Sequence, residues 1–194
     1  MLQHMALQEG TFERLRAAGC ADEVAYVQAC LRLFFNPEAS ASTAPAPAIS
    51  VADVCDIARL NKVATFVLKA LSRPPVGETP PGLLEWLDTY RRRTIAMNSS
   101  GIMDSMAIDK ALRDSKIDFV FLKGPFQQQL LYGDHFMKPS GDVDILVSPA
   151  GFFKARDALR SIGYEVAGKS RSVWWVRFLG EQHMVRSQGP KLST

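Results

Sequence analysis

Apolar residues recur at helical spacing over most of the first 115 residues. In the run ADEVAYVQACLRLFF, Val24, Val27, Leu31 and Phe34 fall on one stripe. Residues three or four positions apart share a face of an α-helix, so this spacing predicts a helix within residues 11–35.

Two further helices are expected before the pattern changes. The first runs from residue 51 to about 71, in one piece or two, and Ser50 with Asp53 three residues on is typical of a cap at its start. The second runs from residue 83 to about 114. The sequence NSSG at 98–101 lies within this long stripe and is expected either to kink the helix or to split it.

From residue 116 the pattern changes to short β-branched and aromatic runs. IDFVFL (117–122) and DVDILV (142–147) predict two strands, and YEVAG, VWWVRFL and QHMVRS predict three more. A helix is expected to begin at Pro125, because proline suits the first helical position, and to end at Gly133. The apolar residues expected on the buried face of that helix are Phe126, Leu130 and Leu131.

These patterns predict an α+β protein. Residues 1–115 form a helical region, interrupted over 36–50 by a linker rich in Ala, Pro and Ser. Residues 116–194 form an α/β part in which helices alternate with strands.

Composition narrows the classes of function. The chain of 194 residues is 47% hydrophobic and 22% charged. Its net charge is +3, from 23 basic and 20 acidic residues. This excess of positive charge is too small to indicate nucleic acid or a membrane surface as the partner. The three cysteines match no zinc pattern and are expected to be buried, reduced thiols, which favours a reducing, cytoplasmic compartment. No apolar stretch approaches the roughly 18 residues of a membrane span.

Asp142 and Asp144 are unusual inside a strand. Side chains alternate faces along a strand, so the two carboxylates are expected on the same face, where they repel each other unless a cation lies between them. Mg²⁺ takes hard oxygen ligands and binds one or two carboxylates together with substrate phosphates. The alternative interpretation is that Asp142 completes the turn PSGD and that Asp144 is a partly exposed strand residue.

The turn KGP at 123–125 supplies a second element of the candidate site. Gly124 would let a phosphate approach the backbone, and the free amides at the start of the following helix attract anions. Many strand-to-helix turns look like this one. A phosphate-binding turn followed within about twenty residues by an Asp-x-Asp strand is a more specific pattern.

The segment FLKGPFQQQLLYGDHFMKPSGDVDILV resembles the core of the nucleotidyltransferase superfamily that includes DNA polymerase β. Within it, the similarity is to a group of uncharacterised bacterial nucleotidyltransferases with the pattern Leu-Lys-Gly, a helix ending near Tyr, a basic residue, and Asp-hydrophobic-Asp-hydrophobic-Leu-Val. The close similarity covers residues 116–166, and a looser one covers most of the chain from about residue 50.

The resemblance implies a mixed β-sheet with flanking helices and Mg²⁺-dependent transfer of a nucleoside monophosphate from a nucleoside triphosphate to an acceptor hydroxyl. Asp142 and Asp144 would be the catalytic residues and the ligands of two Mg²⁺ ions. The candidate nucleotide-binding residues are Lys123, Gly124, Lys138 and Ser140. The acceptor is unknown, and a small molecule, peptide or protein is favoured over nucleic acid.

Two departures from the family pattern affect this expectation. Lys138 stands where arginine is common, and lysine lacks the planar fork with which arginine binds phosphate. The third carboxylate of the superfamily is expected on a strand after EQHMVRSQGPKLST, so the sequence reads as a C-terminally truncated relative. Glu181 is a substitute for it, although at the wrong end of the predicted hairpin.

A second hypothesis follows from the missing third acid, namely a catalytically weak or inactive nucleotide-binding or regulatory module. Three other groups of residues with reactive, aromatic or charged side chains each have two interpretations. His183 is either a metal ligand or base, or a partly buried strand residue. Trp174 and Trp175 either stack on a base or belong to an ordinary strand, and the run 91–93 of three arginines is either a phosphate patch or a solvated helix face.

Overall fold

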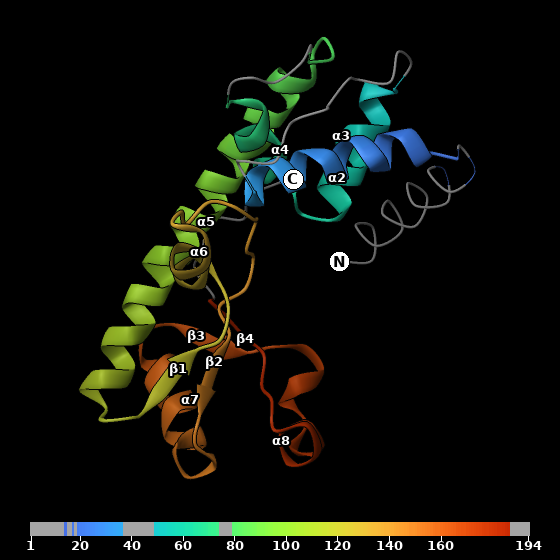
Figure 1. Ribbon diagram of the computed structural model, residues 1–194. Helices are drawn as coiled ribbons and strands as arrows, with labels where there is room; N and C mark the ends of the chain where they lie inside the picture. The colour runs from blue at the N-terminus through green and yellow to red at the C-terminus, as the bar shows by residue number, and fades with distance from the viewer. Residues whose placement is uncertain (1–13, 15–16, 18, 37–48, 74–78, 187–194) are drawn as a thin grey trace. The chain divides into compact units, whose positions relative to one another are not determined.

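The computed structural model describes residues 14, 17, 19–36, 49–73 and 79–186 (Figure 1). The linker predicted over 36–50 lies almost wholly outside these residues. The chain divides into two compact units, one made of residues 1–99 and 125–141 and the other of residues 100–124 and 142–194. The boundary predicted at residue 115 stays a prediction.

The first unit is helical. It contains α2 (Ala21–Phe35), α3 (Val51–Leu60), α4 (Ala64–Leu71), the beginning of α5 (Leu83–Asp114) and α6 (Pro125–Tyr132). The expected cap is present, because the Ser50 side chain accepts a hydrogen bond from the Asp53 amide, and the helix predicted over 51–71 is divided into α3 and α4.

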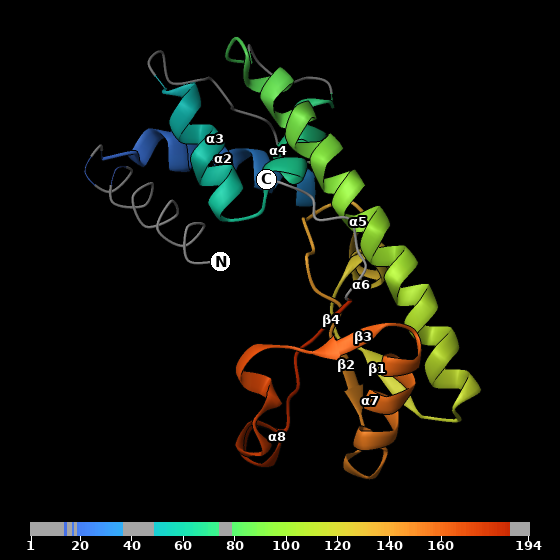
Figure 2. The same cartoon turned by 180° about the vertical axis from the view of Figure 1, so that it is seen from behind.

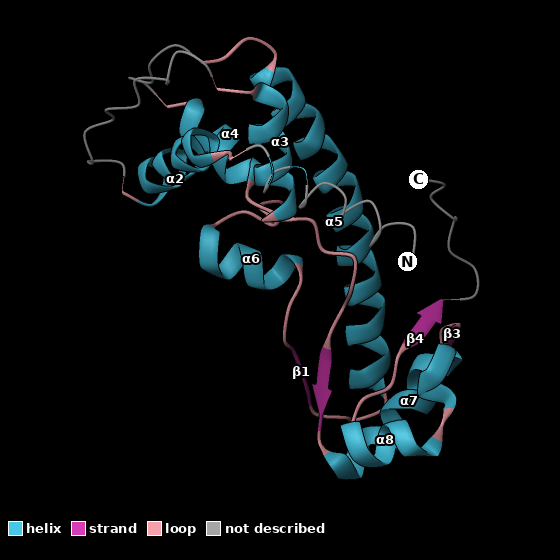
Figure 3. Ribbon diagram, turned by 90° about the vertical axis from the view of Figure 1, so that its right-hand side faces the viewer, coloured by secondary structure: helices cyan, strands magenta, loops and turns pink. Residues whose placement is uncertain are grey.

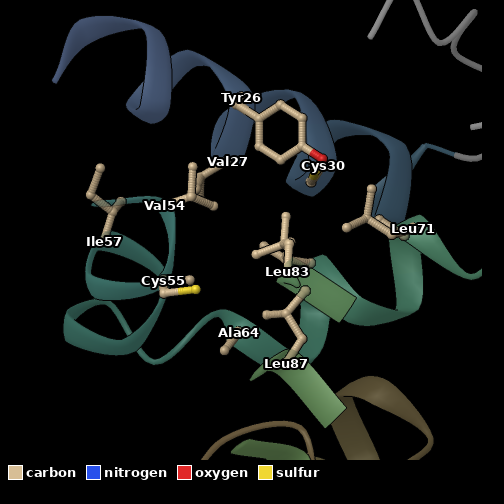
Figure 4. Packing of buried hydrophobic residues seen from close by; sticks show 13 residues of the cluster. Tyr26, Val27, Cys30, Val54, Cys55, Ile57, Ala64, Leu71, Leu83 and Leu87 are labelled. Atoms are coloured by element: carbon tan, nitrogen blue, oxygen red, sulfur yellow. The ribbon is translucent and has the colours of Figure 1, made fainter. Parts of the chain in front are cut away.

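The core of this unit is formed by α2, α3, α4 and the beginning of α5. Figure 4 shows buried side chains of α2, α3 and α4 directed toward the start of α5. Its members include Val27, Cys30, Val54, Val67, Leu83 and Leu87. Burial of this apolar surface is what holds short helices together that would be marginal in isolation.

Helix α5 is one unbroken helix, so the sequence NSSG does not split it (Figure 3). The Ser105 side chain satisfies its hydroxyl group within the helix: it donates a hydrogen bond to the carbonyl of Gly101 at 2.7 Å. Asn98 points its amide away from the helix, to partners described below.

The second unit contains two antiparallel strand pairs. Strand β1 (Phe119–Phe121) pairs with β2 (Ile145–Val147), and β3 (Tyr164–Val166) pairs with β4 (Met184–Arg186). Two short 3₁₀ turns, Pro149–Gly151 and Gly168–Arg171, precede α7 (Phe152–Ser161) and α8 (Val173–Leu179).

The second core lies on one face of the β1–β2 pair. Ala155 and Ala158 of α7 pack there with Ile108 and Leu112 of α5, and both views show α7 beside β1 and β2 (Figure 1, Figure 2). The alternating residues packed against this core are Phe119 and Phe121 of β1, Ile145 and Val147 of β2, and Val143 just before β2.

The α+β class is confirmed, whereas the mixed sheet is not. Within the described residues the strands form two separate antiparallel pairs and no parallel pair. The mixed nucleotidyltransferase sheet therefore stays a prediction. None of the helices in these parts of the chain is long and apolar enough to cross a lipid bilayer.

Two sequence-based expectations are wrong. The run VWWVRFL is helix α8, which Ser172 caps by accepting from the Trp174 amide and which ends at Gly180 with φ of 61°. Strand preference depends on the surroundings of a segment, so composition alone does not decide between strand and helix here. The second error concerns the buried face of α6. The residues expected there, Phe126, Leu130 and Leu131, are exposed, and Gln128 is buried instead.

Candidate functional site

The turn after β1 requires a glycine. Gly124 is buried and has φ of 109°, a backbone conformation that side chains with a Cβ atom rarely adopt. Helix α6 begins at the next residue, Pro125, as the sequence predicts. The predicted change of direction between strand and helix is therefore present, and its geometry explains the glycine.

Asp142 and Asp144 precede β2, which is shorter than the strand predicted over 142–147, and Asp144 lies beside the turn. The amide of Leu122 donates to the carbonyl oxygen of Asp144 at 2.9 Å, which extends the β1–β2 ladder by one bond. Val143 and Ile145 pack against the core, and Asp144, which alternates with them, is 38% exposed. The register of the two strands thus brings the Asp-x-Asp segment to the glycine turn, although 20 residues separate Gly124 from Asp144 in the sequence.

An ion pair joins the two segments. Lys123 Nζ lies 2.8 Å from Asp144 Oδ2. The hydrogen bond and charge of Asp144 raise the pKa of the Lys123 ammonium, and the charges of Asp142 and Glu181 raise this pKa further. Lys123 is therefore a charged ammonium paired with Asp144, and two further acids favour its charge.

Asp142, which lies two residues before Asp144 in the sequence, is exposed. Its placement on the same face as Asp144, and its role as a metal ligand, stay predictions. Among the described residues, no group of three or more His, Cys, Asp or Glu side chains is close enough together to hold a metal ion. Two neighbouring carboxylates supply the hard oxygen donors that Mg²⁺ takes together with phosphate, so the donor set fits an ion that arrives with a nucleotide.

Glu181 and His183 precede β4. The Glu181 Oε1 atom lies 2.7 Å from His183 Nε2, and both side chains are 59% exposed. His183 is thus neither within a strand nor substantially buried, and its ring lies edge-on to Trp175 at 6.0 Å. Both residues belong to the same unit as Asp144.

Lys138 and Ser140 belong to the other unit, and their backbone is held by two buried amides. Asn98 of α5 donates to the carbonyls of His135 at 2.7 Å and Lys138 at 2.9 Å, and accepts from the Ser140 amide at 2.9 Å. Gln128 of α6 accepts from the Lys138 amide at 2.7 Å and donates to its carbonyl at 2.9 Å. Sequence reasoning missed both amides, whose partners are backbone groups 10 to 42 residues away along the chain.

Asp134 fixes the beginning of the same loop. It accepts from the Phe136 amide at 2.8 Å and pairs with Lys69 at 2.6 Å and Arg91 at 3.3 Å. Burial by itself would raise the pKa of Asp134, but these partners hold the pKa below its ordinary value. Arg91 therefore has a structural partner, while Arg92 lies exposed beside Asp88 on the helix surface.

A shallow hollow lies at the opposite end of β1. Phe119 pairs with Val147 there, whereas Leu122 lies beside Asp144 at the other end. The residues that line the hollow are Arg113, Lys116, Ile117, Asp118 and Phe119. The hollow is separate from Asp142, Asp144 and the Gly124 turn.

The sequence was compared with known proteins. The model of a protein family described as "Uncharacterised nucleotidyltransferase" matches residues 47–191. No curated protein and no solved structure is significantly similar to the chain.

Proposed function

The chain belongs to this family of uncharacterised nucleotidyltransferases, and on that premise we propose that it transfers a nucleoside monophosphate from a nucleoside triphosphate to an acceptor hydroxyl with the help of Mg²⁺. Asp142 and Asp144 would hold the ion. The phosphates would lie at the Gly124 turn. The acceptor is proposed to be a small molecule, peptide or protein.

The observation that carries the proposal is the contact between the two segments of the predicted motif. Lys123, next to the glycine turn, reaches Asp144 at 2.8 Å, and the Leu122 amide bonds to the Asp144 carbonyl. A triphosphate at the turn would therefore lie within reach of a cation held by Asp144. Lys138 and Ser140 belong to the other unit, and their proposed nucleotide-binding role rests on the sequence.

In the proposed reaction the acceptor oxygen bonds to the α-phosphorus, the bond to the bridging oxygen breaks, pyrophosphate leaves, and the hydroxyl proton is released. The bound ion would neutralise charge on the reacting phosphate. The protein's own contribution would be positioning: a glycine turn for the phosphates, Asp144 fixed by a bond of the strand ladder, and the Lys123 ammonium beside it.

The test is titration of the full chain with a Mg²⁺–nucleoside triphosphate by calorimetry. The double variant Asp142→Asn/Asp144→Asn should lose most of the binding seen with the wild type. Asp118→Asn is the matched control, because it removes one carboxylate at the far end of β1 and should leave binding unchanged. Equal binding by the wild type and the double variant would refute the proposal.

A second candidate is a nucleotide-binding module with weak or no turnover. One observation supports this candidate. Among the described residues, the acids near Lys123 do not form a cluster of three that could hold a metal ion. Incubation with the four labelled triphosphates and cell extract distinguishes the two candidates. Transfer of label that depends on Asp144 supports the enzyme, and tight nucleotide binding without transfer supports the module.

A further inference from the structure

The contact between Lys123 and Asp144 is an ion pair at the protein surface. The Lys123 side chain is 74% exposed and that of Asp144 is 38% exposed. Holding a long, flexible side chain in one conformation costs entropy, and water screens the attraction, so such pairs are weakly held and readily exchanged. The lysine is therefore free to move when a stronger partner for either charge arrives.

More than one acid acts on Lys123. Asp144 contacts it directly, and the charges of Asp142 and Glu181 also act on its ammonium. One positive charge thus offsets part of the repulsion among the carboxylates of this unit. Removal of that charge would leave the acids more attractive to any other cation.

We propose that Lys123 is a resident counter-ion of Asp144, which competes with a divalent metal ion and moves to the triphosphate when metal and nucleotide bind together. The inference rests on the proposed function, since it requires that Asp144 holds the ion. Lys123 is a positioning residue in this scheme. It weakens metal binding at Asp144 until a phosphate is present to receive the ammonium.

The physical reason is the repulsion between two cations at one carboxylate. An ammonium 2.8 Å from Asp144 Oδ2 opposes the approach of a doubly charged ion to the same group. A triphosphate at the neighbouring Gly124 turn offers the ammonium a new anionic partner. Metal and nucleotide should then bind with positive coupling, and by linkage each tightens the binding of the other by the same factor.

The experiment measures Mn²⁺ binding by electron paramagnetic resonance, with and without a non-hydrolysable triphosphate analogue, at fixed ionic strength. Without nucleotide, Lys123→Met and Lys123→Gln should bind Mn²⁺ about two- to five-fold more tightly than the wild type, the range expected from loss of one exposed ion pair. Lys154→Met is the matched control. Lys154 is exposed on α7, which packs on the opposite face of β1–β2, and its removal should leave the affinity unchanged.

Two further comparisons complete the test. The analogue should tighten Mn²⁺ binding to the wild type and do so less for Lys123→Met. The gain from Lys123→Met should vanish when Asp144 is already Asn, because the ion pair is then absent. Circular dichroism checks that each variant is folded, which is expected from the exposure of Lys123.

The inference is overturned if both Lys123 variants bind Mn²⁺ no more tightly than the wild type, or if the gain persists on the Asp144→Asn background. These results differ from failure of the proposed function. That failure appears as unchanged Mn²⁺–nucleotide binding in Asp142→Asn/Asp144→Asn, whatever the substitutions of Lys123 do.

Discussion

The buried amide of Asn98 should be a principal support of the loop that leads to Asp142. Its side chain is fully buried and makes three hydrogen bonds, to the carbonyls of His135 and Lys138 and from the amide of Ser140. Asn98→Ala removes all three bonds. The Lys138 carbonyl keeps its bond from Gln128, so two backbone groups lose their partner.

The magnitude follows from the number of bonds. A hydrogen bond contributes about 1 kcal/mol net, and a buried group left without a partner costs about 1–3 kcal/mol. His135 and Ser140 are half-buried, so water reaches part of the vacated positions. We expect Asn98→Ala to lower the free energy of unfolding by about 3 kcal/mol.

The assay is urea denaturation followed by circular dichroism, together with hydrogen exchange of the Ser140 amide by NMR. Ser100→Ala is the control, because Ser100 is exposed on the same helix, and it should change stability by less than about 0.5 kcal/mol. The Ser140 amide should exchange faster in Asn98→Ala alone. An effect of Asn98→Ala as small as that of Ser100→Ala, with Ser140 exchange unchanged, would refute the reasoning.

Three further predictions concern backbone strain, acid stability and thiol reactivity. Gly124→Ala should destabilise the protein by about 1–3 kcal/mol because φ is 109°, whereas Gly141→Ala, where an added Cβ meets no atom within 4 Å, should be nearly neutral in urea denaturation. Because the pKa of Asp134 is lowered in the folded protein, its contribution to stability is present above its unfolded pKa and lost as pH falls through the folded pKa. Thermal melts of Asp134→Asn should therefore lie below those of the wild type at neutral pH and converge with them in acid. Burial raises the pKa of the Cys30 and Cys55 thiols to about 11, so both should resist a thiol reagent at pH 7.5 and react once urea is added; rapid reaction of either in the folded protein would contradict the described packing.

Much of the local structure could be predicted because its causes are local. Ser50 caps α3, Pro125 begins α6, and Gly133, with φ of 68°, closes it. These boundaries depend on sterics and hydrogen bonds within a few residues. The long stripe over 83–114 likewise predicted α5, because a 3.6-residue period specifies a helix wherever an apolar face has a core to cover.

Other elements could not be predicted because packing decides them. The strand-like composition of VWWVRFL gave no indication of its partner, and the segment is helix α8. On α6 the apolar residues suggested the buried face, yet Gln128 is buried because it bonds to both backbone groups of Lys138. A polar side chain satisfied by backbone on another segment can displace apolar residues from the interior.

The sequence by itself determined which chemical groups the candidate site has: a glycine turn, a lysine beside it, and two aspartates one residue apart. Only the tertiary structure decided that Lys123 meets Asp144 and that Asn98 holds the loop around Lys138 and Ser140. The reason is that residue type and spacing are properties of one segment. A contact over 20 or 40 residues depends on strand register and on which faces are buried, and these are set by the whole chain at once.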